Sequence, residues 1–290
     1  MQRKPEDSMA YKFESNAPLF TINYEVSDIV KGYYPQIGLT AREGICIMYR
    51  PSGEKQWFNI DCYTIISSVK INMTNFVDKD ELYEIMIYGP IIGNLSKLEV
   101  VIPDDSYANI INLIPEKSLV VAGGSNSYGV GCTTTGLMFS NILERKLNAE
   151  VYHITYNTQN YLEPIHNFYK NSNPPVCDVG ILELDHYSQN ESVVENVLPE
   201  VISLMKQRCK YLIGWYCLAN VKSYKKIIAN NTINDYIYNN DIEIVDLSYL
   251  YDDEYREMCT YNNFYINDSG NVMVYKKLKE TIRRVVKWKI

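Results

Sequence analysis

The stretch Val120–Gly129 combines an apolar run with residue types that can perform nucleophilic chemistry. Two glycines follow the apolar run and lead to Ser125, and a helical pattern starts soon afterwards. Because glycine lets the backbone turn tightly, the turn places Ser125 at the end of a strand and near the first amides of a helix. Such amides stabilise a negative charge that develops during acyl transfer. The pattern therefore predicts a serine nucleophile, although an ordinary glycine-rich turn between a strand and a helix explains it equally well.

Strands and helices alternate after residue 115. Five short apolar runs predict strands, and amphipathic stretches between them predict helices. This alternation is typical of a mostly parallel sheet covered by helices on both faces. In such sheets the site lies at the carboxyl ends of the strands, where Ser125 is expected. The predicted strands are Ser118–Ala122, Glu150–Thr155, Asp178–Leu184, Tyr211–Trp215 and Asp241–Asp246, and the predicted helices are Thr135–Leu147, Ser192–Arg208, Val221–Ala229 and Gly270–Trp288.

The first third of the chain has a different pattern. Short β-rich runs are separated by turn residues such as Pro51-Ser52-Gly53 and Gly89-Pro90. Repeated short strands with such turns predict a β-sandwich, here jelly-roll-like. We therefore expect two domains, a β-sandwich module at 1–112 and an α/β domain at 113–290. The strands predicted in the module are Leu19–Val26, Gly44–Arg50, Thr64–Asn72, Leu82–Tyr88 and Lys97–Ile102.

The composition argues against several classes of function. A net charge of -7 is unlike that of a nucleic-acid-binding protein, which normally has a basic face. The seven cysteines are scattered and show no metal-ligand spacing, so we expect free thiols, no metal and no cofactor. No apolar run reaches the length of a membrane span, and the chain starts without the apolar segment of a signal peptide. These features favour a cytoplasmic protein and leave a homo-oligomer open.

The sequence that follows the turn with Ser125 contains further recognisable segments. Gly129-Val130-Gly131-Cys132 follows directly, then come a helix, a second strand and Tyr161-Leu162-Glu163. This order resembles a branch of the SGNH (GDSL-like) hydrolases in which a GxSxxxG block leads into a Gly-Cys segment. The β-rich first third is similar to the module that precedes the hydrolase in that branch, so the resemblance covers nearly the whole chain. It implies a three-layer, flavodoxin-like α/β domain, and a serine esterase, deacetylase or acyltransferase that acts on an acylated, sugar-like substrate.

The resemblance implies roles for individual residues. It makes Ser125 the nucleophile and the backbone amides around Gly124 and Ser125 oxyanion donors. The family's second block carries a glycine as a further donor, and Thr158 is the nearest equivalent in this chain. The third block supplies an asparagine side chain, for which Gln189 or Asn190 is available.

The last block departs from the family pattern. The family's histidine and the acid that orients it fall on Tyr265 and Asn262, before a turn and a glycine that do align. A tyrosine with an ordinary pKa of about 10 does not accept a serine proton efficiently at neutral pH. His186, just after the third strand, is the best substitute base, and a surface-loop histidine is the alternative interpretation. Glu183 and Asp185 flank the same strand end, where carboxylates are commonly solvated.

Two functions stay open at this point. In the first, the protein is a degenerate relative of the SGNH hydrolases that binds an acylated or glycan ligand and is inactive or weakly active. In the second, it is a serine esterase, deacetylase or acyltransferase with a rebuilt acid–base pair. The departures at Tyr265, Asn262 and Thr158 favour the first function, whereas Ser125 favours the second. The hydrogen-bond partner of the Ser125 hydroxyl distinguishes the two.

Overall fold

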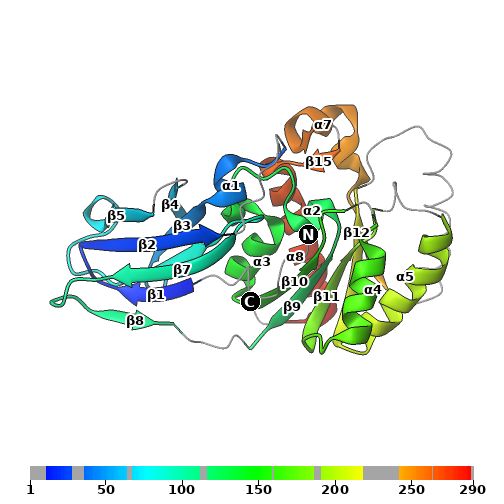
Figure 1. Ribbon diagram of the computed structural model, residues 1–290, viewed down its shortest axis with the longest axis horizontal. Helices are drawn as coiled ribbons and strands as arrows, with labels where there is room; N and C mark the ends of the chain where they lie inside the picture. The colour runs from blue at the N-terminus through cyan, green and yellow to red at the C-terminus, as the bar shows by residue number, and fades with distance from the viewer. Residues whose placement is uncertain are drawn as a thin grey trace. The chain divides into compact units, whose positions relative to one another are not determined.

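The computed structural model describes residues 11–27, 36–63, 67–111, 116–158, 160–185, 191–217, 242–262 and 264–288 (Figure 1). The chain forms two compact units. One contains Glu6–Ile114 together with the short segment Thr133–Gly136, and the other contains Pro115–Cys132 and the chain from Leu137 onward. No helix in the described ranges is long and apolar enough to span a membrane.

The first unit is a β-sandwich. Its described strands are β1 (Tyr11–Ser15), β2 (Leu19–Ser27), β3 (Ile45–Pro51), β4 (Phe58–Tyr63), β5 (Ser68–Asn72), β6 (Tyr83–Tyr88), β7 (Asn94–Val101) and β8 (Ala108–Ile110), with short helices α1 (Leu39–Glu43) and η2 (Met73–Asn75). They form two antiparallel sheets of order β4-β3-β6-β1-β8 and β5-β2-β7. Phe20 and Ile22 of one sheet and Ile85 and Ile87 of the other belong to a single buried cluster, so the sheets pack face to face. In each strand these residues are two apart, the period that directs side chains to one face.

The second unit is an α/β domain in which strands and helices alternate as predicted. The predicted strands fall on β9 to β13, and three of the predicted helices fall on α3, α5 and α8. The fourth predicted helix, Val221–Ala229, lies outside the described residues. Its elements are β9 (Ser118–Gly123), α2 (Ser125–Tyr128), α3 (Phe139–Leu147), β10 (Glu150–Thr155), α4 (Leu162–Asn171), β11 (Cys177–Glu183), α5 (Glu191–Lys206), β12 (Cys209–Tyr216), β13 (Glu243–Asp246), η4 (Ser248–Tyr251), α7 (Asp253–Cys259), β14 (Thr260–Tyr261), β15 (Tyr265–Ile266) and α8 (Asp268–Val286). The short helix η3 (Thr135–Leu137) begins in the segment Thr133–Gly136, which belongs to the first unit.

This domain has three layers around a parallel sheet of order β10-β9-β11-β12-β13. Along β9, Leu119 and Val121 join one hydrophobic cluster, whereas Val120 and Ala122 join another on the opposite face. Helices α3 and α8 supply the first cluster, and α4 and α5 supply the second (Figure 1). The fold class predicted from the sequence, a three-layer α/β domain with an N-terminal β-sandwich module, is confirmed.

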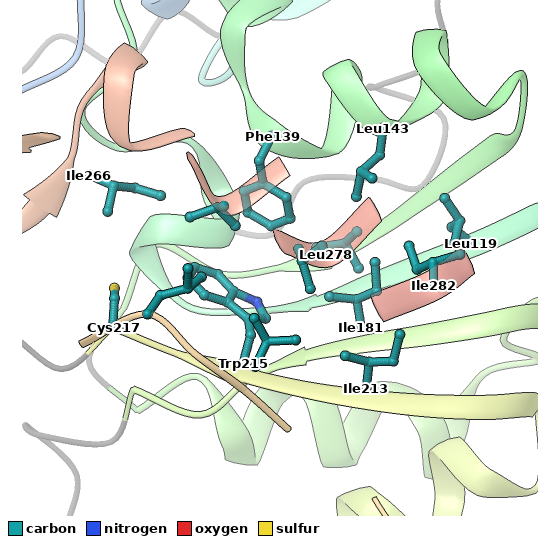
Figure 2. Close-up of a cluster of buried hydrophobic side chains, with 14 of the residues drawn as sticks. Leu119, Phe139, Leu143, Ile181, Ile213, Trp215, Cys217, Ile266, Leu278 and Ile282 are labelled. Carbon is teal, nitrogen blue, oxygen red and sulfur yellow. The ribbon is translucent and has the colours of Figure 1, made fainter. Parts of the chain in front are cut away.

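Large aromatic side chains fill the layer between the sheet and helices α3 and α8. Figure 2 shows Trp215 of β12 beside Phe139 of α3 and Leu278 of α8. The Trp215 and Phe139 rings meet edge to face with their centroids 5.2 Å apart. All three side chains are fully buried, so this cluster fixes β12 against the two helices.

The carboxyl ends of the strands place Ser125, Thr158 and Glu183 at one edge of the sheet. Strands β9, β10, β11 and β12 end at Gly123, Thr155, Glu183 and Tyr216. In a parallel sheet these ends lie side by side, so the loops that follow them converge. Ser125 follows the first of these ends by two residues.

Candidate active site

The turn after β9 presents Ser125 as the first residue of the short helix α2. Gly124 is the residue before the helix, and its backbone lies against the ring of Tyr161, because an added Cβ atom would be 2.5 Å from that ring. The helix closes at Gly129, which has a φ angle of 99° that favours glycine. Ser125 itself is half-buried. The sequence thus folds into the strand–turn–helix that the pattern predicted around this serine.

The hydroxyl of Ser125 donates a hydrogen bond to Oδ1 of Asn157, at 3.1 Å. Asn157 follows β10 and is half-buried, and it is the single hydrogen-bond partner of this hydroxyl among the described residues. An amide oxygen accepts a hydrogen bond but does not take up a proton at neutral pH. The serine is therefore oriented at this edge without being activated by Asn157.

Asn157 was not among the residues singled out from the sequence. Its neighbour Thr158 was expected to replace the family's second oxyanion donor. The backbone amide of Thr158 donates to the carbonyl oxygen of Tyr156 at 2.8 Å, so it is engaged within its own turn. A polar residue two positions after a predicted strand was the available signal for Asn157.

The hairpin of β14 and β15 carries Tyr265 and Asn262. Tyr265 is half-buried and pairs with Tyr261, and Asn262 lies in the exposed turn between them with a φ angle of 57°. This turn geometry suits asparagine, whose short side chain tolerates the left-handed region. The two residues thus lie in one small element.

Two contacts place this hairpin against the serine turn. The backbone amide of Ile266 donates to Oδ1 of Asn126 at 3.1 Å, so the residue after Tyr265 is bonded to the residue after Ser125. The backbone of Gly131 approaches the carbonyl oxygen of Ile266 so closely that an added Cβ atom would lie 2.2 Å from it. The structure therefore brings Tyr265 to the edge that holds Ser125, although the described hydrogen bonds do not join their side chains.

Two carboxylates lie buried beneath the same turn. Glu183 and Asp185 are only 2% and 3% exposed, so the expectation that they are solvated was wrong. Oε2 of Glu183 accepts hydrogen bonds from the backbone amides of Gly124 at 3.0 Å and Ser127 at 2.8 Å. Burial and the neighbouring Asp185 charge raise the pKa of Glu183 above its ordinary value, to about 8. These side chains are enclosed because the turn after β9 folds over them.

The remaining predicted residues, His186, Gln189 and Asn190, lie outside the described residues. Of the other histidines, His153 is fully buried in β10, and His166 of α4 bonds Glu200 of α5 at 2.6 Å. In the described ranges, no three or more histidine, cysteine or acidic side chains are grouped to hold a metal ion.

The described structure also has an open pocket of about 420 Å³ at the opposite edge of the sheet. Its lining includes Tyr211 at the start of β12, Lys206 at the end of α5 and Val285 in α8. The amino-terminal half of β12 is separated from the carboxyl edge by the length of the strand. This pocket is therefore distinct from the Ser125 site.

No protein-family model matches this chain, and a search of curated proteins finds no matching sequence. Among solved structures, a GDSL-like lipase of Bacteroides ovatus superposes with a TM-score of 0.78 over 99% of this chain and 87% of the other, at 17% identity. A family two carbohydrate esterase of Clostridium thermocellum in complex with cellohexaose gives a TM-score of 0.61 over 98% and 96%, at 8% identity. A salicylyl-acyltransferase from a tetracycline biosynthetic pathway gives 0.61 over 94% and 81%, at 9% identity. The fold is that of the SGNH (GDSL-like) hydrolases, so the fold implied by the resemblance is confirmed.

Proposed function

We propose that this SGNH-fold protein binds an acylated, glycan-type ligand at the Ser125 edge and hydrolyses its ester weakly or not at all. The observation that carries this proposal is the hydrogen bond from the Ser125 hydroxyl to the amide oxygen of Asn157. In a working serine hydrolase the hydroxyl donates to a histidine that takes its proton during attack on the ester. Here the acceptor is neutral and stays so, and the hairpin position that would hold the histidine carries Tyr265.

This arrangement lowers the expected rate of ester hydrolysis by a large factor. General base catalysis contributes a factor of about 100 to 10,000. Thr158 stands where the family has a glycine donor, and each oxyanion donor contributes about 3 kcal/mol. Both departures act on the same step, the attack of Ser125. Ligand binding requires neither a general base nor an oxyanion donor. A protein that has lost both can therefore still bind the ligand.

Side chains on the segments that adjoin the serine turn favour a sugar-like ligand. Asn157 and Asn160 offer amide groups at the surface, and Phe264 in the hairpin exposes 46% of its surface. Amide groups exchange hydrogen bonds with hydroxyl groups, and an exposed aromatic ring packs against the apolar face of a sugar ring. The carbohydrate esterase with the same fold, in complex with cellohexaose, supports this ligand class.

One observation favours the alternative, an active serine esterase, deacetylase or acyltransferase. Oδ2 of Asp185 accepts a hydrogen bond from the Asn126 side chain at 3.4 Å, next to Ser125. His186 is the next residue in the sequence, which makes it the candidate for a rebuilt base. The acyltransferase among the neighbours extends this alternative to acyl transfer.

Calorimetric titration with O-acetylated cellohexaose, and with unmodified cellohexaose, tests the binding proposal. We expect the acetylated compound to bind more tightly, and Ser125→Ala to retain binding, because the serine serves as a contact and not as a nucleophile. Phe264→Ala should weaken binding about tenfold, since it removes a packing surface for the sugar.

Tyr211→Ala is the matched control for this titration. Tyr211 is 39% exposed, similar to Phe264, but it lines the pocket at the opposite edge of the sheet. The proposal predicts unchanged affinity in Tyr211→Ala. Affinity lost in Tyr211→Ala and kept in Phe264→Ala would move the ligand to the other pocket, and an absence of binding to either sugar would reject this ligand class.

A further inference from the structure

The backbone around Ser125 is held by one carboxylate oxygen. Oε2 of Glu183 accepts the amide of Gly124, directly before the serine, and the amide of Ser127, two residues after it. An added Cβ atom at Gly123 would lie 2.7 Å from this oxygen, so the carboxylate fills the space directly under the turn. The serine turn is therefore built around the Glu183 side chain.

Asp185 holds the residue between these two amides. Its Oδ2 accepts hydrogen bonds from the side chain of Asn126 at 3.4 Å and from the thiol of Cys217 at 3.1 Å, and its Oδ1 accepts the backbone amide of Cys217 at 3.0 Å. Asn126 in turn bonds the backbone of Ile266, beside Tyr265. The two carboxylates thus connect the serine turn, the end of β12 and the hairpin that carries Tyr265.

Among the described residues, three titratable groups interact with Glu183, and all three are acids. They are Asp185 on the same strand end, Cys217 after β12 and Tyr161 before α4, whose hydroxyl donates to the Glu183 carbonyl oxygen at 2.9 Å. Burial, followed by the Asp185 charge, raises the pKa of the Cys217 thiol as well, so the thiol stays protonated and neutral. Two carboxylates this close titrate as a unit and retain a proton at pH values where isolated carboxylates are ionised.

We propose that Glu183 is a positioning residue for Ser125, and that the proton held by the Glu183–Asp185 pair sets how tightly the serine turn is fixed. An ionised carboxylate accepts amide hydrogen bonds roughly twice as strongly as a neutral acid. The turn therefore tightens as pH rises and the pair loses its proton. This inference rests on the proposed function in one respect, namely that the Ser125 edge is the ligand site.

The effect on overall stability has the opposite sign. The pKa of Glu183 is raised in the folded protein, from 4.5 to about 8, so the folded state binds the proton more tightly than the unfolded state. The stability that this proton contributes is fully present below pH 4.5 and is lost as pH rises through about 8. The local tightening of the turn is thus accompanied by a fall in the free energy of unfolding, which separates the two effects experimentally.

Amide proton chemical shifts of the isotopically labelled full chain test this inference without any ligand. Between about pH 5 and about pH 9, the Gly124 and Ser127 resonances should move downfield with one shared midpoint, because their hydrogen bonds strengthen as Glu183 ionises. Glu183→Gln should abolish this movement. Asp185→Asn should lower the midpoint by about one pH unit or more, because it removes the neighbouring negative charge.

Asp178→Asn is the control. Asp178 lies at the other end of β11, where its carboxylate accepts the backbone amide of Ser118 at 3.0 Å. This variant should leave the Gly124 and Ser127 midpoint unchanged. The inference is overturned if the midpoint persists in Glu183→Gln, or if Asp185→Asn does not move it. If Glu183→Gln does not fold, the result for Asp185→Asn decides alone. Failure of sugar binding would leave these shifts intact, so the two proposals fail separately.

Discussion

Replacing Tyr265 by histidine and Asn262 by aspartate together is expected to raise the rate of p-nitrophenyl acetate hydrolysis by about 100-fold. Histidine has an ordinary pKa near 6.5 and can take the serine proton at neutral pH. The hairpin already lies against the serine turn through the bond between Ile266 and Asn126, so the new imidazole starts at the correct edge. Aspartate tolerates the φ angle of 57° at position 262 about as well as asparagine does.

The gain in hydrolysis rate should depend on Ser125 and on pH. Adding Ser125→Ala to the double variant should remove the gain, and the rate should rise with pH through about 6.5 as the imidazole becomes neutral. We expect Thr158 to limit the gain, because the resemblance assigns it the position of the family's glycine donor. Tyr255→His, a half-buried tyrosine on α7, controls for the addition of any histidine. A double variant no faster than this control would show that residue 265 is not directed at Ser125.

Trp215→Ala is expected to lower the free energy of unfolding by about 3 to 5 kcal/mol. The indole is fully buried and meets the Phe139 ring edge to face in the core shown in Figure 2. Its removal leaves a cavity between β12 and the helices α3 and α8, which this rigid core fills only in part. Urea denaturation of both proteins measures the difference.

Trp215→Phe separates the packing contribution from the polar one. The indole Nε1 has no hydrogen-bond partner in the described part of the chain, so phenylalanine gives up no hydrogen bond there. We expect it to cost about half as much as alanine or less, because it keeps most of the ring volume. Equal losses for the two variants would mean that the indole nitrogen makes a contribution that this packing does not explain.

The sheet was predictable because its signal is local. Runs such as Leu119–Ala122 are apolar at every position, as expected of a strand buried on both faces. The glycines after this strand mark the turn that presents Ser125. In the first unit, β4 and β8 gave no clear signal, since they are edge strands with exposed and polar residues.

The interior of the site was not predictable in the same way. Glu183 and Asp185 are buried because the turn after β9 and the end of β12 lie against them, and these segments are far apart in the sequence. A carboxylate at a strand end carries no local sign of such burial. Asn157 was missed for a related reason: the family pattern directed attention to the glycine position at Thr158, whereas the contact to Ser125 comes from its neighbour.

The central claim is that Ser125 is held but not activated, and the rate of ester hydrolysis with and without this serine tests it most directly. Purified protein should hydrolyse p-nitrophenyl acetate little faster than buffer, and Ser125→Ala should leave that rate unchanged, because an unactivated serine contributes little. A substantial rate that Ser125→Ala abolishes would contradict the account and require another base. Loss of that rate in His186→Ala would then identify the base and establish the protein as a working serine hydrolase.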